Sequence, residues 1–324
     1  MRICLRRREF IAALGGAAAW PLAVRAQQGN RVRRIGLLAN DAEDTAVIPK
    51  YLPPALQKLG WIEGRNLTID VRYGASDVSL YPSYAAELVG LKPDVIVTGG
   101  VAATRAVQQQ TQTIPIVFGS VGDPIAAGIV KSLAHPEGNA TGITAGFASL
   151  GGKMVQLLKE AVPRIERVAD LYYPQLQPQD GFSTSIEEAA HSLGLQVLRI
   201  PYRNPLEFER AIEGFAAEPN RGVIVRVAPS GPFFGLMVKH RLPAIYSLTN
   251  YASDGGLMSY GRNLEAHYSR FASLVDRILR GAKPGDLPVE YTTRFDLVLN
   301  LKVAKAIGIT FPASLIALAD KVIE

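Results

Sequence analysis

Short apolar runs alternate with helix-like segments along almost the whole chain, and this alternation constrains the fold more than any other feature. The runs are continuously apolar, as in IGLL at 35–38 and IPIVF at 114–118. Strands of this kind are typical of parallel sheets whose two faces are both covered by helices. The series of strands and helices recurs after residues 141–144, with no Pro/Ser-rich linker between the two series. The sequence therefore predicts an α/β protein made of two doubly wound units.

The first 26 residues have the composition of an export signal. Three arginines, Arg6 to Arg8, precede an apolar run that is too short to span a bilayer, and small residues stand at positions 24 and 26. We expect cleavage near Ala26. Arg7-Arg8 also resembles the twin-arginine signal of proteins exported already folded, and an ordinary secretory signal is the alternative.

Most of the positive charge belongs to this leader. The chain has a net charge of +6, of which the leader's five arginines and Glu9 supply +4. The mature chain is thus nearly neutral, which argues against a nucleic-acid partner. The single cysteine, Cys4, also lies in the leader, so no lipid-anchor cysteine, disulfide or zinc–thiolate site is expected in the mature chain.

The motifs of common enzyme classes are missing from the sequence. It contains no G-x-S-x-G elbow, no complete phosphate-binding loop and no G-x-G-x-x-G after the first strand. The histidines do not have the spacing of metal ligands; they are His135, His191, His240 and His267. We therefore expect no metal, no cofactor and no catalytic residues, and we favour binding over catalysis.

Open parallel sheets bind ligands at the carboxyl ends of their strands, so the residues that follow each strand are the candidates. Asn40 follows the first strand. Gly99 and Gly100 follow a later strand and open a helix, whose unpaired N–H groups suit a carboxylate or phosphate. The two glycines also suit a tight strand-to-helix turn. Ligand contact and turn formation therefore both remain open at this position.

Further candidates come from both halves of the chain. Ser120 and Asp123 follow the next strand, and Asp123 suits either a ligand ammonium or the cap of a short helix at Pro124. In the second half, residues after strands are Tyr173, Ser230, Tyr246 and Tyr260. Each tyrosine alone is explained by ordinary packing, whereas as a set the tyrosines predict a cleft lined by aromatic rings.

Several stretches resemble one known family. They are LGWIEGRNL at 59–67, LKPDVIV at 91–97, PEGNATG at 136–142, GGLMSYG at 255–261 and GAKPGDLPVE at 281–290. These stretches resemble the periplasmic substrate-binding proteins of ATP-binding-cassette (ABC) importers, in the group that includes tryptophan and tyrosine binders. The resemblance covers nearly the whole mature chain.

The resemblance implies a type I periplasmic-binding fold, with two Rossmann-like lobes joined by three crossings near Thr144, 260–263 and 289–293. We expect residues 31–144 and 262–290 to form the N-terminal lobe, and residues 145–261 and 291–324 to form the C-terminal lobe. Glu137, Ala140 and Tyr291 to Thr293 depart from the family pattern near the hinge. These departures weaken any transfer of ligand identity.

The implied function is that of a periplasmic, monomeric receptor without a membrane anchor. It binds a small ligand, with an aromatic amino acid as the leading class, and delivers it to a membrane permease. We expect Gly100 and its neighbours to receive the ligand carboxylate, and Ser120, Asp123 and Thr144 to bind its polar groups. Tyr173, Tyr246 and Tyr260 would pack its side chain. The alternatives are an exported hydrolytic α/β enzyme and a binding protein that feeds a sensor.

Overall fold

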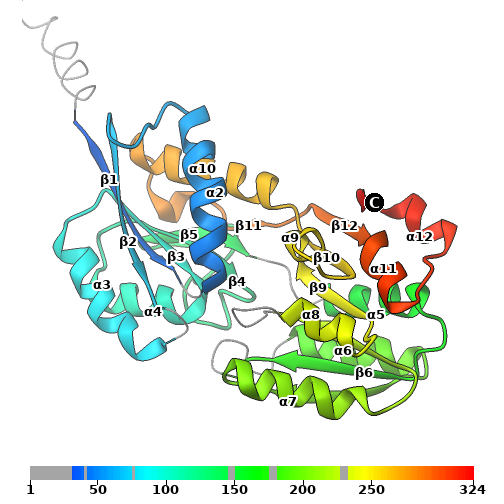
Figure 1. Cartoon of the computed structure of the whole chain (residues 1–324). Helices are drawn as coiled ribbons and strands as arrows, with labels where there is room; N and C mark the ends of the chain where they lie inside the picture. The colour runs from blue at the N-terminus through cyan, green and yellow to red at the C-terminus, as the bar shows by residue number, and fades with distance from the viewer. Residues whose placement is uncertain (1–30, 40–41, 75–76, 145–149, 175–180, 227–232) are drawn as a thin grey trace, which may run out of the picture.

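A computed structural model describes residues 31–39, 42–74, 77–144, 150–174, 181–226 and 233–324 (Figure 1). The predicted leader at 1–26, and the candidate residues Asn40 and Ser230, lie outside the described residues. Within the described part of the chain, no helix is both long and apolar enough to cross a membrane.

The first of two sheets is six-stranded and entirely parallel, in the order β11-β5-β4-β3-β1-β2. Its strands are β1 (Arg33–Ala39), β2 (Leu67–Tyr73), β3 (Val95–Gly99), β4 (Ile116–Val121), β5 (Ala140–Thr144) and β11 (Glu290–Tyr291). Helices α2 (Ala42–Lys58) and α10 (Leu264–Leu279) pack on one face. Helices α3 (Tyr81–Gly90) and α4 (Gly100–Gln110) pack on the other, and a short 3-10 helix, η1 (Val78–Leu80), precedes α3.

The second sheet is seven-stranded, in the order β13-β12-β10-β9-β8-β6-β7, and only the β10–β12 pair is antiparallel. Its strands are β6 (Arg167–Tyr172), β7 (Gln196–Pro201), β8 (Arg221–Val225), β9 (Ala244–Leu248), β10 (Met258–Arg262), β12 (Phe295–Asn300) and β13 (Lys321–Ile323).

Helices again cover both faces of the second sheet. On one face lie α5 (Leu150–Ala161), α6 (Gly181–Ser192), α11 (Leu301–Ile307) and α12 (Ala313–Leu318). On the other lie α7 (Pro205–Ala216), α8 (Phe233–Lys239) and α9 (Thr249–Ser253), while η3 (Pro284–Asp286) precedes β11. The prediction of two doubly wound α/β units is therefore confirmed.

One helix is longer than the sequence pattern indicates. The pattern favours a helix from Pro53 to Leu59, because proline normally breaks a helix interior. Helix α2 instead begins at Ala42 and contains three prolines in its interior. Residues 140–144 form the fifth strand of the first sheet, and the second series of helices and strands begins after them.

The chain passes between the two sheets in three places, after β5, between β10 and α10, and between β11 and β12. Backbone hydrogen bonds tie these crossings together, from Thr292 N–H to the Thr144 carbonyl at 3.0 Å and from Asn263 N–H to the Arg294 carbonyl at 3.0 Å. The carboxyl ends of strands from both sheets therefore meet at the crossings. The exact division of the chain into lobes stays a prediction.

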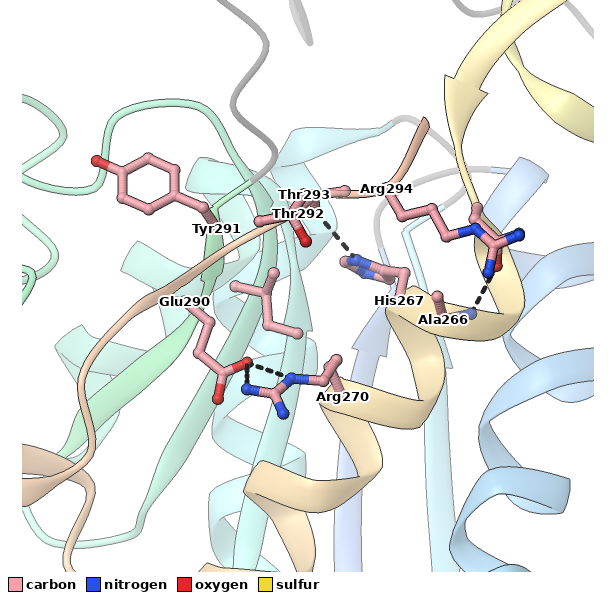
Figure 2. A pocket seen from close by; sticks show the side chains of 10 residues that line it. Ala266, His267, Arg270, Glu290, Tyr291, Thr292, Thr293 and Arg294 are labelled. Atoms are coloured by element: carbon pink, nitrogen blue, oxygen red, sulfur yellow. Dashed lines mark hydrogen bonds and ion pairs between the residues drawn. The ribbon is translucent and has the colours of Figure 1, made fainter. Parts of the chain in front are cut away.

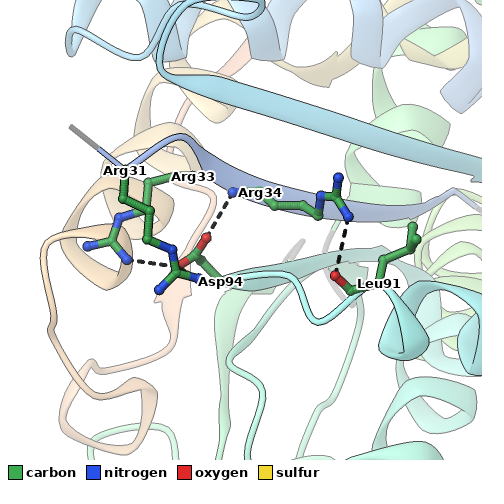
Figure 3. A network of polar contacts seen from close by, with 5 residues as sticks. All are labelled: Arg31, Arg33, Arg34, Leu91 and Asp94. Atoms are coloured by element: carbon green, nitrogen blue, oxygen red, sulfur yellow. Dashed lines mark hydrogen bonds and ion pairs between the residues drawn. The ribbon is translucent and has the colours of Figure 1, made fainter.

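A polar network holds β1 against its neighbour β3 at the end of the first sheet that lies away from the crossings (Figure 3). Asp94, just before β3, accepts hydrogen bonds from the Arg33 guanidinium at 2.7 Å and from the Arg34 backbone N–H at 2.9 Å. Arg31 lies 3.4 Å from the same carboxylate, and the Arg34 guanidinium donates to the Leu91 carbonyl at 3.3 Å. The network lies at the amino ends of β1 and β3, so it stabilises the sheet without lining the crossings.

Gly261 makes the closest backbone approach in the second sheet. A Cβ at this position would lie 2.0 Å from the Ser247 carbonyl oxygen in β9, and the β9–β10 register shifts between Ser259 and Arg262. Only glycine fits such an approach between two backbones. Gly261 therefore determines how the end of β10 sits against β9.

We expect Gly261→Ala to lower the free energy of unfolding by about 3 kcal/mol, because the new methyl group overlaps backbone atoms that have little room to move. Gly214→Ala is the matched control, since Gly214 is exposed in α7 and a Cβ there meets nothing within 4 Å. The control should be neutral or stabilising by up to about 1 kcal/mol. Guanidinium denaturation measures both values, and equal stability of Gly261→Ala and wild type would contradict the close approach.

Candidate functional site

Gly99 and Gly100 form the turn from β3 into α4, as predicted. Gly100 is buried with φ +77°, a conformation that favours glycine, and Gly99 is the N-cap in extended conformation. The helix has no side-chain cap and no acidic residue in its first turn. Its first backbone N–H groups therefore carry the positive end of the helix dipole without a capping side chain.

Ser120 lies beside this turn. Gly99 is paired with Gly119, so Ser120 follows its pairing residue at the same edge of the sheet as this turn. Ser120 has φ +56°, in the left-handed region that serine rarely adopts. Such backbone strain is found most often at binding and active sites. The Ser120 hydroxyl accepts a hydrogen bond of 2.9 Å from Nη1 of Arg262.

Arg262 is the last residue of β10, and the sequence-based prediction omits it. Its side chain bridges the two sheets by reaching Ser120, yet only 6% of the residue is exposed. Its Nε is buried without a hydrogen-bond partner. Within the described ranges, no carboxylate forms an ion pair with it. The sequence holds one signal for this residue, because it is the charged position that follows GGLMSYG at an expected crossing.

Thr144 and Asp123 complete this rim, and both bind the protein's own backbone. Thr144 is 1% exposed, and its hydroxyl donates to the Gly122 carbonyl at 2.7 Å. The Asp123 carboxylate accepts from the backbone N–H groups of Ile125 at 3.0 Å and Ala126 at 2.9 Å. The capping geometry expected of Asp123 is present, although the segment that begins at Pro124 is a turn and not a helix.

The three tyrosines do not gather around one cavity. Tyr246 is fully buried between Phe234 and Tyr251, so its ring has no surface for a ligand in this conformation, and burial raises the pKa of its hydroxyl. Tyr173 packs on the same face of the second sheet, edge-on to Tyr202. Tyr260 stacks on Phe295 on the opposite face. Of the three, Tyr173 and Tyr260 are partly exposed.

A pocket of about 580 Å³, called the hinge pocket below, lies between α10 and the β11–β12 crossing (Figure 2). Its lining residues are Ile143, Asn263, Ala266, His267, Arg270, Glu290, Tyr291, Thr292, Thr293 and Arg294. Arg270 makes two contacts of 2.8 Å with Glu290, which join α10 to β11. None of the predicted ligand residues lines this pocket.

His267 lies in the wall of the hinge pocket and is only 6% exposed. Its Nδ1 lies 3.4 Å from the Thr292 hydroxyl, and its ring packs edge-on against Tyr268. Desolvation, followed by the nearby positive charge of Arg262, holds the pKa of His267 well below its ordinary value of 6.5. The native state therefore keeps this imidazole neutral.

Two parallel-dominated α/β sheets joined by three crossings define the type I periplasmic binding protein fold, and solved structures share it. A conserved domain protein from Vibrio cholerae is 25% identical with a TM-score of 0.79, over 90% of this chain and 100% of that one. A domain from Streptococcus pneumoniae in complex with L-Trp is 23% identical with a TM-score of 0.77, over 90% and 99%. A ligand-free, open substrate binding protein from Clostridium difficile, also 23% identical, has a TM-score of 0.64 over the same shares.

The chain belongs to the ABC transporter substrate binding protein family, which it matches over residues 36–323. Among curated proteins, it is 26% identical over 259 residues to a tyrosine-binding protein from Clostridioides difficile. The match covers 78% of this chain and 74% of that relative. The family expected from the sequence motifs is therefore confirmed.

The neutral state of His267 predicts a pH dependence of stability. Because the unfolded chain protonates this histidine below about pH 6.5 while the native state resists protonation, the free energy of unfolding should fall as the pH drops from 7 to 5. The contribution of one such group is at most about 1.4 kcal/mol per pH unit. We expect His267→Gln to flatten this part of the profile, as measured by denaturant unfolding at several pH values.

The matched control is His191→Gln, because His191 is exposed near the end of α6. Its profile should follow that of the wild type. Parallel profiles for the wild type and His267→Gln would show that His267 is not held neutral in the native state.

Proposed function

We propose that this chain is the extracytoplasmic solute receptor of an ABC importer and that its ligand is an amino acid, with aromatic amino acids as the leading candidates. One observation carries the proposal. The buried Arg262 of the second sheet donates a hydrogen bond to Ser120 of the first sheet, and Ser120 follows Gly119, the pairing partner of Gly99 at the uncapped amino end of α4. The names of the relatives support the ligand class, since one is a tyrosine-binding protein and another was solved with L-Trp.

Ligand binding between the two sheets would stabilise the closed arrangement of the lobes, because only that arrangement allows contacts with both rims at once. The permease would then recognise the closed shape.

The residues proposed to contact the ligand are Gly99, Gly100, Ser120 and Asp123 from the first sheet, with Tyr173 from the second. Asp123 keeps one carboxylate oxygen outside its two backbone hydrogen bonds and is exposed, so it suits a ligand ammonium. The Thr144 hydroxyl already donates to the Gly122 carbonyl, so Thr144 shapes the rim of the site and does not bind the ligand through this hydroxyl. Export by the leader, release into the periplasm as an unanchored monomer and delivery to a permease belong to the same proposal.

We expect the protein, purified from its own periplasm, to bind L-tyrosine or L-tryptophan with a Kd in the micromolar range, about −8 kcal/mol. Ligand at 100 times the Kd would raise the free energy of unfolding by about 2.7 kcal/mol. Thermal unfolding and titration calorimetry measure the two effects, and glucose is the negative control.

A shift with glucose but with no amino acid would contradict the proposed ligand class. Turnover of a panel of esters, phosphates and glycosides would instead support the exported enzyme. An intact ligand response in a strain where uptake of that ligand does not depend on this protein would favour the sensor-coupled receptor.

A further inference from the structure

We infer that Arg262 is the anion receptor of the interlobe site and that the ligand must carry a carboxylate, held between the Arg262 guanidinium and the amino end of α4. The inference rests on the proposed function for the location of the site. It goes further by naming the residue of the second sheet that binds the ligand carboxylate and so selects acids over amides.

Arg262 is a buried charge. A guanidinium stays protonated in proteins, and burial of a charge is costly unless an opposite charge and hydrogen bonds compensate for it. Arg262 is 6% exposed, but its one hydrogen bond to a described residue goes to the neutral hydroxyl of Ser120. Its Nε has no partner among the described residues. Within that part of the chain, this buried positive charge therefore has no carboxylate beside it.

Other arginines of this chain show what full compensation looks like. Arg33 lies 2.7 Å from Asp94, and Arg270 makes two contacts of 2.8 Å with Glu290. Arg262 has no equivalent among the described residues, and its uncompensated charge also contributes to the lowered pKa of His267, after desolvation.

The second half of the receptor comes from the first sheet. Gly99, the N-cap of α4, is paired with Gly119, and the next residue, Ser120, is the one that Arg262 touches. The first-turn N–H groups of α4 have no side-chain cap and favour an anion. A carboxylate has two oxygens, so it can accept from the helix end and from the planar fork of Arg262 at the same time. A carboxylate in this position would connect both sheets.

The geometry also explains the strained backbone of Ser120. Its φ of +56° directs the hydroxyl to Nη1 of Arg262 and thereby orients the guanidinium. Ser120 is thus a positioning residue for Arg262, in addition to any contact of its own with the ligand.

The test compares acids with their amides on matched variants. We use L-tyrosine and L-tryptophan, their primary amides, and the amines tyramine and tryptamine, which lack the carboxylate. Wild type should bind the acids and bind the amides and amines at least about 10-fold more weakly. Loss of a hydrogen-bonded charge should weaken acid binding by Arg262→Gln about 10- to 150-fold. The same variant should bind the amides nearly as well as wild type does.

Arg294→Gln is the matched control, because Arg294 lies on the next crossing, is exposed, and loses the same charge. It should bind the acids within about threefold of wild type. Arg262→Lys keeps the charge without the planar fork, so it should recover part of the loss. Thermal unfolding of each variant shows whether it is folded, and if Arg262→Gln is not, Arg262→Lys and the acid-to-amide ratio of wild type decide.

The outcomes separate this inference from the proposed function. If wild type binds an aromatic acid and Arg262→Gln binds it equally well, or if wild type does not distinguish acid from amide, the inference is wrong while the proposed function stands. If no aromatic amino acid binds, a broader panel of carboxylates paired with their amides replaces the ligands. Binding of a non-aromatic carboxylate that depends on Arg262 then supports the inference alone, and binding only of uncharged compounds overturns it.

Discussion

The contact of β10 with β9 at Gly261 is the constraint on which the site depends. Because position 261 carries no side chain, the backbone of β10 lies against the Ser247 carbonyl, where a Cβ would be 2.0 Å from the oxygen. The strand register shifts at this point, and the next residue, Arg262, reaches the first sheet. A substitution at 261 would therefore affect both the stability of the second sheet and the position of the one side chain that joins it to Ser120.

Charge is used differently at the two ends of the first sheet. At the amino ends of β1 and β3, Asp94 is surrounded by arginines and backbone donors, so its contacts stabilise local structure. At the carboxyl ends, no carboxylate of the described residues pairs with Arg262 or caps the amino end of α4. The paired charges around Asp94 contribute little to specificity for a ligand. Buried donors without a partner, such as Arg262 Nε, contribute strongly, because a ligand that does not bond to them leaves them unsatisfied.

Much of the fold follows from the sequence, because continuous apolar strands and intervening helices leave few alternatives to covered parallel sheets. For example, alternation of apolar and polar residues indicates a strand at 67–73 and a helical pattern covers 264–279, and these ranges coincide with β2 and α10. The site is less predictable. Because helices cover both faces of the second sheet, its strands are apolar on both sides and their sequences do not indicate which face a residue is on. Tyr246 and Tyr260 lie on opposite faces for this reason without any sign of it in the sequence. Arg262 is missed because the apolar pattern ends at Tyr260, while the strand continues two residues further.

The positions of β11 and β13 in the two sheets affect the order in which the chain can fold. One edge of the first sheet is formed by residues 290–291, and one edge of the second by residues 321–323, although both sheets contain strands from much earlier in the chain. Each sheet can be completed only after its late edge strand has been synthesised, and contacts between such distant segments form slowly. Folding of both sheets therefore waits for segments that are made long after their first strands.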